Sequence, residues 1–223
     1  MTENKKENLN NRMIKFLFEG APVRGACVQM AEEWQEMIKF HHYPENVAAL
    51  LGQFTAGALL LSSTIKFEGS LILQVKGSGP IAFIYAEVRN PMSVRAMAEI
   101  REGAEIKPEM DLQELINKDG KGLCALILDP KDRRPGVQPY QGMVSLESNS
   151  VAENLENYMA KSEQLETKLY LAADCKKLGG LVIQKMPSVG GNVSEISDPD
   201  AWGRIMQLAH TVTKEELLNV PAT

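Results

Sequence analysis

The stretch from Val47 to Ile65, VAALLGQFTAGALLLSSTI, contains no charged residue over 19 positions. Its larger apolar side chains recur at helical spacing, and most positions between them are small or apolar. A helix of this kind either spans a membrane or lies buried in a protein core. Polar side chains within it, such as Gln53 and Thr55, and the lack of an aromatic belt or basic flank favour a buried central helix.

Strand-forming segments are predicted on both sides of this helix. They are β-prone, mostly apolar runs bounded by turn residues: Met13–Phe18, Val23–Val28, Ser70–Lys76, Ile81–Val88, Val94–Ile100, Gly122–Asp129, Tyr140–Leu146, Lys168–Ala173 and Gly180–Met186. The last two are joined by a turn at Asp174–Gly179. Further helices are predicted at Gln29–Phe40, at Asp111–Ile116 and at Ser150–Lys161. In the third, Ser150 and Glu153 have the spacing of a capping box.

This order of elements predicts an α+β fold. Mixed or antiparallel sheets pack around a long buried central helix, and a short helical linker region follows. Residues 1–12 are polar and expected to be mobile, residues 13–186 form the core domain, and residues 187–223 form the linker region. The boundary is placed at Met186 because the sequence PSVGGNVSEIS, rich in Gly and Ser, begins directly after it.

Two short amphipathic helices are predicted in the linker region. The first begins at Asp198-Pro199, and the second lies behind a capping box formed by Thr213 and Glu216. Helices this short cannot bury their apolar faces alone, so they must dock on the core domain or on a partner.

The apolar residues near the carboxyl end form the candidate binding surface. They share large side chains on or beside the linker helices: Leu181, Met186, Val189, Trp202, Ile205, Met206, Leu217 and Leu218. One interpretation is ordinary docking of the tail onto the core. The other is a surface for unfolded chains that becomes exposed when the tail undocks. The sequence leaves both interpretations open.

Composition and charge exclude some classes of partner. The net charge is −5 at pH 7, which argues against nucleic-acid binding, because nucleic-acid binders usually carry a basic patch. Apolar content of 44% and charged content of 24% are ordinary for a soluble globular protein. The amino-terminal sequence MTENKKENLNN lacks the apolar core of a signal peptide. We therefore expect a cytoplasmic protein that binds neither nucleic acid nor membrane.

The chain contains three cysteines, Cys27, Cys124 and Cys175, which are widely spaced and form no CxxC pair. No metal site or other cofactor is therefore expected in this chain. Arg24 precedes Cys27, and a nearby cation lowers the pKa of a thiol. A thiol-dependent enzyme that uses Cys27 or Cys124 is thus the alternative to a binding protein.

Two other patterns are weaker evidence for a ligand-binding or catalytic site. Gly77-Ser78-Gly79 is followed by Pro80 and a second strand, whereas a dinucleotide-binding loop needs a third glycine that opens a helix. A hairpin turn is the better interpretation. His41-His42 lacks the spacing of known zinc or catalytic histidine motifs. We expect no catalytic residue and no enzymatic activity.

Several short motifs resemble the bacterial redox-regulated heat-shock holdase family, the thirty-three-kilodalton chaperonins. They are spread in order from about residue 13 to the end of the chain: Val23-Arg24-Gly25, Leu73-Gln74 with Gly77-Ser78-Gly79-Pro80, Tyr140-Gln141-Gly142 with Leu146-Glu147, Ser162-Glu163-Gln164-Leu165 with Thr167, and Glu215-Glu216-Leu217-Leu218. Each motif is only moderately specific, but their conjunction in this order is strong.

The resemblance implies an ATP-independent holdase that acts as a homodimer and binds unfolded or misfolded client proteins. In the family, oxidative stress regulates this activity through a carboxyl-terminal module with four zinc-binding cysteines. Cys27, Cys124 and Cys175 do not match those positions. The resemblance therefore implies zinc and regulatory disulfides only in a module beyond residue 223. A static assembly scaffold, which would bind one folded partner, is a third hypothesis.

Overall fold

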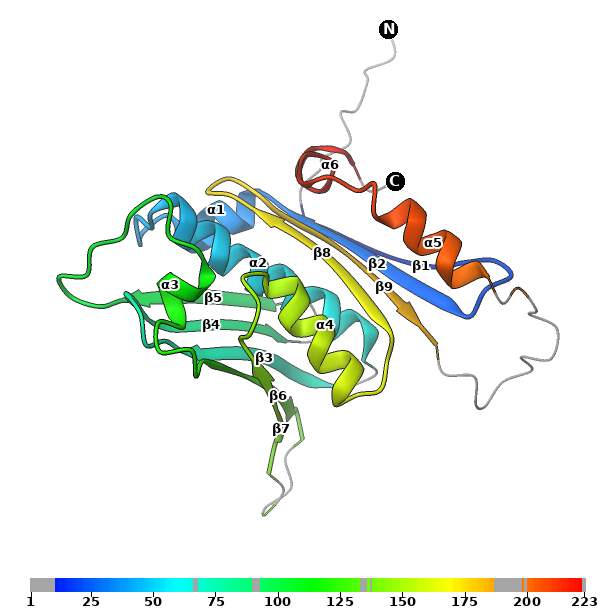
Figure 1. The fold of residues 1–223 in the computed structure, drawn as a ribbon, viewed down its shortest axis with the longest axis horizontal. Helices are drawn as coiled ribbons and strands as arrows, with labels where there is room; N and C mark the ends of the chain where they lie inside the picture. The colour runs from blue at the N-terminus through cyan, green and yellow to red at the C-terminus, as the bar shows by residue number, and fades with distance from the viewer. Residues whose placement is uncertain are drawn as a thin grey trace, which may run out of the picture.

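The computed structural model describes residues 11–65, 68–89, 93–132, 136, 138–186, 198 and 200–221. Figure 1 shows the arrangement of the elements, whose order and bounds along the chain are β1 (Arg12–Leu17), β2 (Val23–Met30), α1 (Glu32–Ile38), α2 (Glu45–Thr64), β3 (Gly69–Lys76), β4 (Ile81–Arg89), β5 (Ser93–Ile100), α3 (Leu112–Ile116), β6 (Leu123–Pro130), β7 (Tyr140–Ser145), α4 (Val151–Lys161), β8 (Thr167–Ala173), β9 (Leu178–Lys185), α5 (Ala201–Ala209) and α6 (Lys214–Asn219).

The strands form two antiparallel sheets. One has four strands in the order β1-β2-β9-β8, and the other has five in the order β5-β4-β3-β6-β7. The first sheet joins the beginning of the core to its end, because β2 pairs with β9. The predicted α+β fold with sheets around a central helix is confirmed.

The central helix α2 lies between the two sheets, with α4 beside it (Figure 1). By length and composition alone α2 could cross a membrane, but 72% of its most apolar window is buried inside this fold. Its larger side chains, including Leu51, Phe54 and Leu59, are almost completely inaccessible to solvent. The uncharged stretch is thus explained by burial on most sides, as the sequence predicted.

The helix predicted at Gln29–Phe40 begins too early. Gln29 and Met30 belong to β2, where they pair with Gly179 and Leu178 of β9, and α1 begins only at Glu32. Their local sequence favours a helix, but completing the ladder with β9 satisfies their backbone groups and places Gln29 against the tail. Tertiary pairing therefore overrides local propensity.

Smaller details of turns and helix caps also differ from the predictions. The β8–β9 turn is shorter than expected, because the Asp174 carboxylate accepts hydrogen bonds from the backbone N–H of Lys176 and Lys177, and β9 begins at Leu178. At α4, Ser150 caps the Glu153 N–H as predicted. The Glu153 carboxylate, however, accepts from the hydroxyl of Ser148, so the capping box is only half formed.

The start of the first tail helix was also misplaced. The cap of α5 is Asp200 and not Asp198-Pro199, and Asp198 instead accepts hydrogen bonds from Arg204 in the first turn. Pro199 lies outside the described residues, as do residues 1–10 and the linker segment 187–197. The capping box of Thr213 and Glu216 at α6 is confirmed in both directions.

Candidate functional site

The four-stranded sheet has two apolar faces. Its inner face packs on α2 through residues such as Val28 and Val182. Its outer face, formed by alternate residues of the same strands, carries Val23, Leu181 and Ile183. Helices α5 and α6 lie over this outer face (Figure 1). Because both faces of the sheet are apolar, the outer one needs a cover, and the tail helices supply it.

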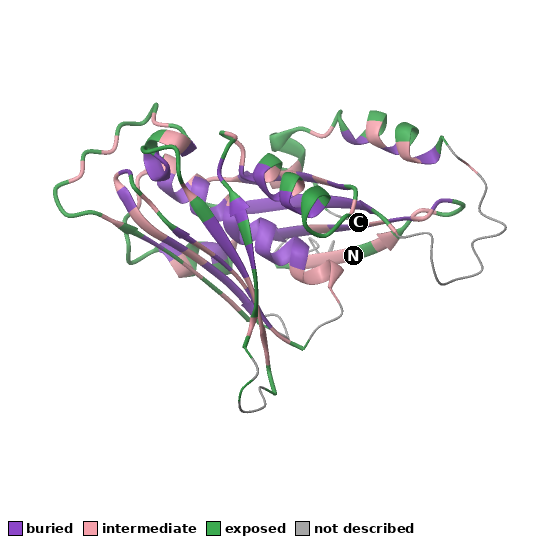
Figure 2. Cartoon of the chain, turned by 60° about the horizontal axis from the view of Figure 1, so that its bottom comes forward, coloured by how far each residue is buried: buried purple, intermediate pink, exposed green. Residues whose placement is uncertain are grey.

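The contact between the tail and the sheet is a hydrophobic cluster separate from the main core, which we call the tail cluster. Its buried members are Ala21, Val23, Leu181, Ile183, Ala201, Ile205 and Ala209. Its partly buried members are Phe16, Phe18, Cys27, Tyr170, Trp202, Met206, Val212 and Leu217. In Figure 2 the central helix is almost entirely buried, whereas the tail helices combine a few buried residues with partly buried and exposed ones. The tail is thus docked with much less burial than the core.

The structure brings most of the predicted surface residues together. The tail cluster contains five of them: Leu181, Trp202, Ile205, Met206 and Leu217. Leu218 is half-buried outside the cluster. Met186 is half-buried beyond β9, where its N–H donates to the Pro22 carbonyl oxygen over 2.7 Å. Val189 lies outside the described residues.

Sequence reasoning missed the sheet side of the cluster, especially Phe16, Phe18 and Tyr170. The available signal was the alternation of side chains along the strands, which assigns Cys27, Leu181 and their cross-strand neighbours to one face. The hydroxyl of Tyr170 is buried there and has no hydrogen-bond partner in the described part of the chain.

Polar contacts fix the last helix over one end of this face. The buried amide Nε2 of Gln29 donates to the carbonyl oxygens of Leu217, over 2.9 Å, and of Val220, over 2.7 Å. Lys177 Nζ donates to Asn219 Oδ1 over 2.8 Å. These contacts tie one end of the four-stranded sheet to the carboxyl-terminal turn of α6.

A cavity of about 220 Å³ remains between α6 and the sheet. It is lined by apolar and polar groups of β2, β9 and the tail: Cys27, Val28, Gln29, Gly180, Leu181, Val212, Glu216, Leu217 and Val220. This pocket is open to solvent and has room for several water molecules, each of which takes up about 30 Å³ in the liquid, so α6 does not seal the sheet face here. The docked tail forgoes dispersion contacts that a filled interface would make.

A second feature lies at β7, the edge strand of the five-stranded sheet. A cavity of about 250 Å³ opens beside it, with apolar walls from the ends of α2 and β6 and polar groups from Arg24, Tyr140, Tyr158 and Glu163. Tyr140 and Tyr158 both donate to Glu163 Oε1, over 2.9 and 2.7 Å. Burial first, and then the hydrogen bonds with Tyr140 and Glu163, raise the pKa of Tyr158.

This cavity is where three of the sequence motifs meet. Arg24 belongs to VRG, Tyr140 to YQG and Glu163 to SEQL. The glycine of YQG is required, because a Cβ at Gly142 would lie 2.0 Å from the Tyr158 hydroxyl oxygen. Residues separated by more than a hundred positions in the sequence thus form one surface at a sheet edge.

Comparison with known proteins agrees with the family resemblance of these motifs. The sequence model of the family described as "Hsp33 protein" matches residues 11–223. The chain belongs to the Hsp33 family. The "33 kDa chaperonin" of Methylobacillus flagellatus is 38% identical over 215 residues, which cover 96% of this chain and 69% of the relative. That of Neisseria gonorrhoeae (strain NCCP11945) is 39% identical and is covered to 67%.

A solved structure of an Hsp33 homologue supports the fold. The 33 kDa chaperonin from Thermotoga maritima superimposes with a TM-score of 0.73 at 20% sequence identity, over 95% of this chain and 71% of that one. The two antiparallel sheets and the central helix are therefore the architecture that this Hsp33-family chain shares with that homologue.

Cys27 and Cys124 of this Hsp33-family chain lack the environment of a reactive cysteine. Cys124 is completely buried, which raises the pKa of its thiol to about 12. Burial also raises the pKa of Cys27. The alternative in which Arg24 activates Cys27 is not supported, because the two side chains lie on opposite faces of β2, where Arg24 donates to Gln184 on the inner face. Both shifts disfavour thiolate chemistry.

The described residues of this Hsp33-family chain also hold no group of three or more His, Cys, Asp or Glu side chains arranged to bind a metal. Two polar networks described above hold surfaces of the chain together: the contacts of Gln29 and Lys177 with α6, and the Tyr140–Tyr158–Glu163 network beside β7.

Proposed function

We propose that the chain is the client-binding core of an ATP-independent holdase chaperone. The outer face of the four-stranded sheet, once the tail helices leave it, is the surface that receives unfolding proteins. The single observation that carries this proposal is the tail cluster, in which an apolar sheet face is covered by two short helices over an unfilled cavity. The names of the curated relatives support a chaperone.

A holdase of this kind needs no nucleotide. It binds the unfolded state of a client and so lowers the concentration available for self-association. A permanently exposed apolar face of this size would itself promote aggregation, so a removable cover is required. The tail cluster provides both the apolar face on the sheet and a cover made of two short helices.

In the intact protein we propose that oxidative stress controls the cover. Zinc bound to a carboxyl-terminal cysteine module would keep that module folded, because metal-binding free energy is folding free energy. Oxidation would release the metal and remove the support of the tail helices. The chain described here would hold no cofactor, reside in the cytoplasm, and be either constitutively active or weakly regulated.

The proposal is tested by light scattering from a thermally unfolding client, malate dehydrogenase, without ATP and without oxidant. We expect excess chain over client to suppress the rise in scattering, and an equal mass of bovine serum albumin to leave it unchanged. No suppression at any ratio would exclude constitutive activity. Suppression that appears only with ATP would contradict a holdase.

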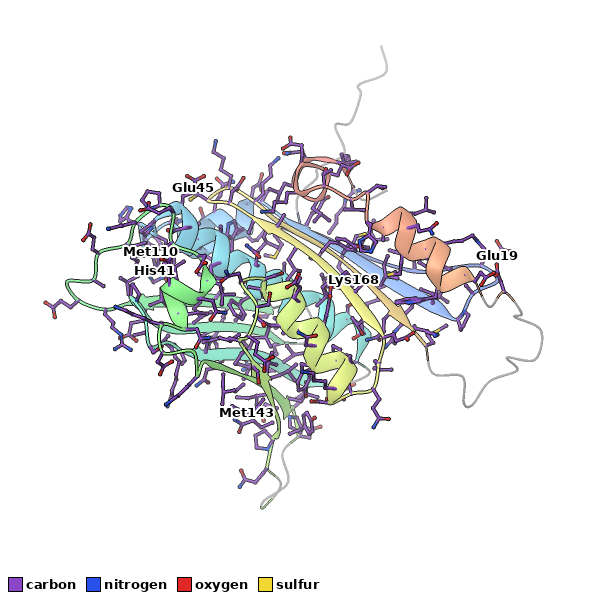
Figure 3. All side chains as sticks on the ribbon, viewed as in Figure 1. Glu19, His41, Glu45, Met110, Met143 and Lys168 are labelled. Carbon is purple, nitrogen blue, oxygen red and sulfur yellow. The ribbon has the colours of Figure 1, made fainter. Side chains whose placement is uncertain are left out.

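We further propose that two copies of the chain associate through β7. This edge strand exposes 50% of Tyr140 and 48% of Met143, and the open cavity with Arg24 and Glu163 lies beside it. Met143 is labelled in Figure 3 on the far side of the molecule from α5 and α6. Pairing there would cover a sheet edge and leave the client face free.

A further inference from the structure

Arg24 on β2 carries a charge that no carboxylate in the described part of the chain neutralises. Its guanidinium is half-buried and donates only to a neutral group, the Oε1 atom of Gln184, through Nε over 3.0 Å and through Nη2. No carboxylate of the described residues forms an ion pair with it. Burial lowers the pKa of Arg24, but a guanidinium keeps its proton in a protein. The charge therefore remains, and an anion beside it would be stabilised.

A chain of hydrogen bonds fixes this guanidinium in place. Thr167 donates its hydroxyl proton to the carbonyl oxygen of Leu165 over 3.1 Å, so its oxygen is free to accept from Nε2 of Gln184 over 2.8 Å. Because the amide nitrogen of the buried Gln184 faces Thr167, its Oε1 atom must face Arg24. Leu165 and Thr167 of one sequence motif thus orient the arginine of another, and the charge is held in position before any ligand arrives.

The same arginine lines the cavity of about 250 Å³ beside β7. The walls of this cavity are otherwise mostly apolar: Leu61, Ile65, Leu126, Leu128, Met159 and Leu165. An apolar cavity of about 150 Å³ can hold a benzene molecule, so this one has room for a chain of several carbons. Apolar walls with a few oriented polar groups are the usual form of a small-molecule site.

The other charged group of the cavity, Glu163, already has donors within the chain. Its Oε1 atom accepts from the hydroxyls of Tyr140 and Tyr158, over 2.9 and 2.7 Å. The negative charge is thus stabilised by two hydrogen bonds, whereas the positive charge of Arg24 faces only a neutral amide. Charge complementarity therefore favours an anionic ligand over a cationic one.

We propose that this cavity binds a small monocarboxylate with an apolar body, such as a short or medium-chain fatty acid, and that Arg24 pairs with its carboxylate. The Nη1 atom of Arg24 donates to no described residue and is available to the ligand, whose body lies against the apolar walls. This inference goes beyond the proposed function and does not depend on it, because no residue of the tail helices lines the cavity.

The test is a titration of the full chain, labelled with ¹³C at the methionine methyl groups, with hexanoate, 1-hexanol and hexylamine. The three probes share an apolar body and differ in charge. We expect saturable binding of one hexanoate per chain, about tenfold or more tighter than that of 1-hexanol, since hydrogen bonds to charged groups contribute factors of this size. Hexylamine that binds as tightly as hexanoate would overturn the proposal.

The methionine signals also locate the bound probe. Met159 lines the cavity, whereas Met206 belongs to the tail cluster. Hexanoate should shift the methyl signal of Met159 and leave that of Met206 unchanged. A shift of Met206 without a shift of Met159 would place the probe on the tail face and contradict the assignment to the cavity.

Arg24→Met removes the charge and keeps an apolar stem. The affinity for hexanoate should fall to that for 1-hexanol, and Arg24→Lys should restore part of the difference. Arg101→Met is the matched control, because Arg101 also donates to neutral oxygens, the carbonyls of Gly77 and Gly79, but does not line the cavity. It should leave hexanoate binding unchanged. Undiminished binding in a folded Arg24→Met variant would refute the pairing.

Thr64→Phe covers the case in which Arg24→Met does not fold. Thr64 is the half-buried last residue of α2 and lines the cavity, so a larger side chain there takes the space of the apolar body. Both hexanoate and 1-hexanol should then bind at least tenfold more weakly, and full binding in this variant, folded by circular dichroism, would overturn the proposal. An affinity for hexanoate that falls as the chain concentration rises would assign the cavity to a second copy instead.

Discussion

Gly179 lies directly opposite Gln29 in the β2–β9 pair, and the carbonyl oxygen of Leu217 occupies the space that any side chain at position 179 would need. This arrangement joins an early strand, a late strand and the tail at one point. The small residue permits close approach of the backbone, and the long amide uses that approach to reach two carbonyl groups. The site is therefore specified jointly by a glycine and a glutamine that sequence reasoning had placed in separate elements.

Ile205→Asp should release α5 from the sheet. Ile205 is 9% exposed in the tail cluster, and burying a side chain of this kind contributes about 1.5–3 kcal/mol, which a charge in its place would forfeit. We expect amide hydrogen exchange to rise across residues 201–221 while α2 stays protected, and suppression of client aggregation to increase. Leu208→Asp, on the same helix but at a position 72% exposed, is the control and should change neither. Unchanged exchange in Ile205→Asp would contradict docking through the tail cluster.

Tyr170→Phe should leave the free energy of unfolding unchanged or slightly raised. The Tyr170 hydroxyl is buried and has no partner among the described residues, so its removal costs no hydrogen bond. Tyr43→Phe is the contrasting variant, because the Tyr43 hydroxyl both donates to the Ala98 carbonyl and accepts from the Ala98 N–H, each over 2.9 Å. Urea denaturation should show a loss of about 1–2 kcal/mol for Tyr43→Phe only. An equal loss in both variants would show that Tyr170 has a partner in solution.

The sequence predicts the main body of this fold well because its signals are local. The uncharged run of α2, the Gly-rich turn between β3 and β4, and the capping serine of α4 each act within a few residues of the element that they define. The end of β2 could not be predicted this way. Gln29 becomes part of a strand because β9 pairs with it, about 150 positions later in the chain.

The same limit applies to the candidate site. Trp202, Ile205, Met206 and Leu217 were identified because amphipathic helices after a linker need a docking surface. Their partners on the sheet, such as Tyr170, have only the alternation of side chains along a strand as a signal. In a sheet with two apolar faces this alternation is hidden in a continuous apolar run and does not say which face meets the tail.

Glu87 on β4 should make stability depend on pH in the acid range. Its side chain is buried, and burial by itself raises its pKa. Hydrogen bonds from Ser70, Tyr85 and Arg89 outweigh this effect and hold the pKa below the ordinary value of 4.5. A carboxylate with a lowered pKa in the folded state stabilises the fold above its unfolded-state pKa, and this contribution is lost as pH falls through the folded-state pKa. Glu87→Gln should therefore reduce the loss of unfolding free energy between neutral pH and about pH 3, measured by urea denaturation. Glu99→Gln, at an exposed position on the same face of the sheet, is the control, and an equal effect of both changes would contradict the role of Glu87.

Cys27→Ala and Cys124→Ala should each retain suppression of client aggregation. Burial raises the pKa of both thiols, to about 12 for Cys124, which disfavours the thiolate form that a catalytic cysteine needs. Light scattering with each variant checks this, and circular dichroism should confirm that Cys124→Ala stays folded. Loss of activity in a folded Cys27→Ala variant would instead favour the thiol-dependent alternative.

Met143→Arg should separate the proposed dimer into single chains. Met143 lies on the outer face of β7, at the edge of the five-stranded sheet, and is half exposed in the single chain. When two β7 strands meet, this change places a guanidinium from each copy on the same face beside the seam, and like charges across paired strands are destabilising. Met97→Arg is the matched control, since Met97 is also exposed on the outer face but on β5, the opposite edge of the same sheet. Light scattering after size-exclusion chromatography should give twice the chain mass of 24.6 kDa for the parent and for Met97→Arg, and the single mass for Met143→Arg. A dimer that persists in Met143→Arg and dissociates in Met97→Arg would move the interface to β5, and a parent chain of single mass would exclude the association altogether.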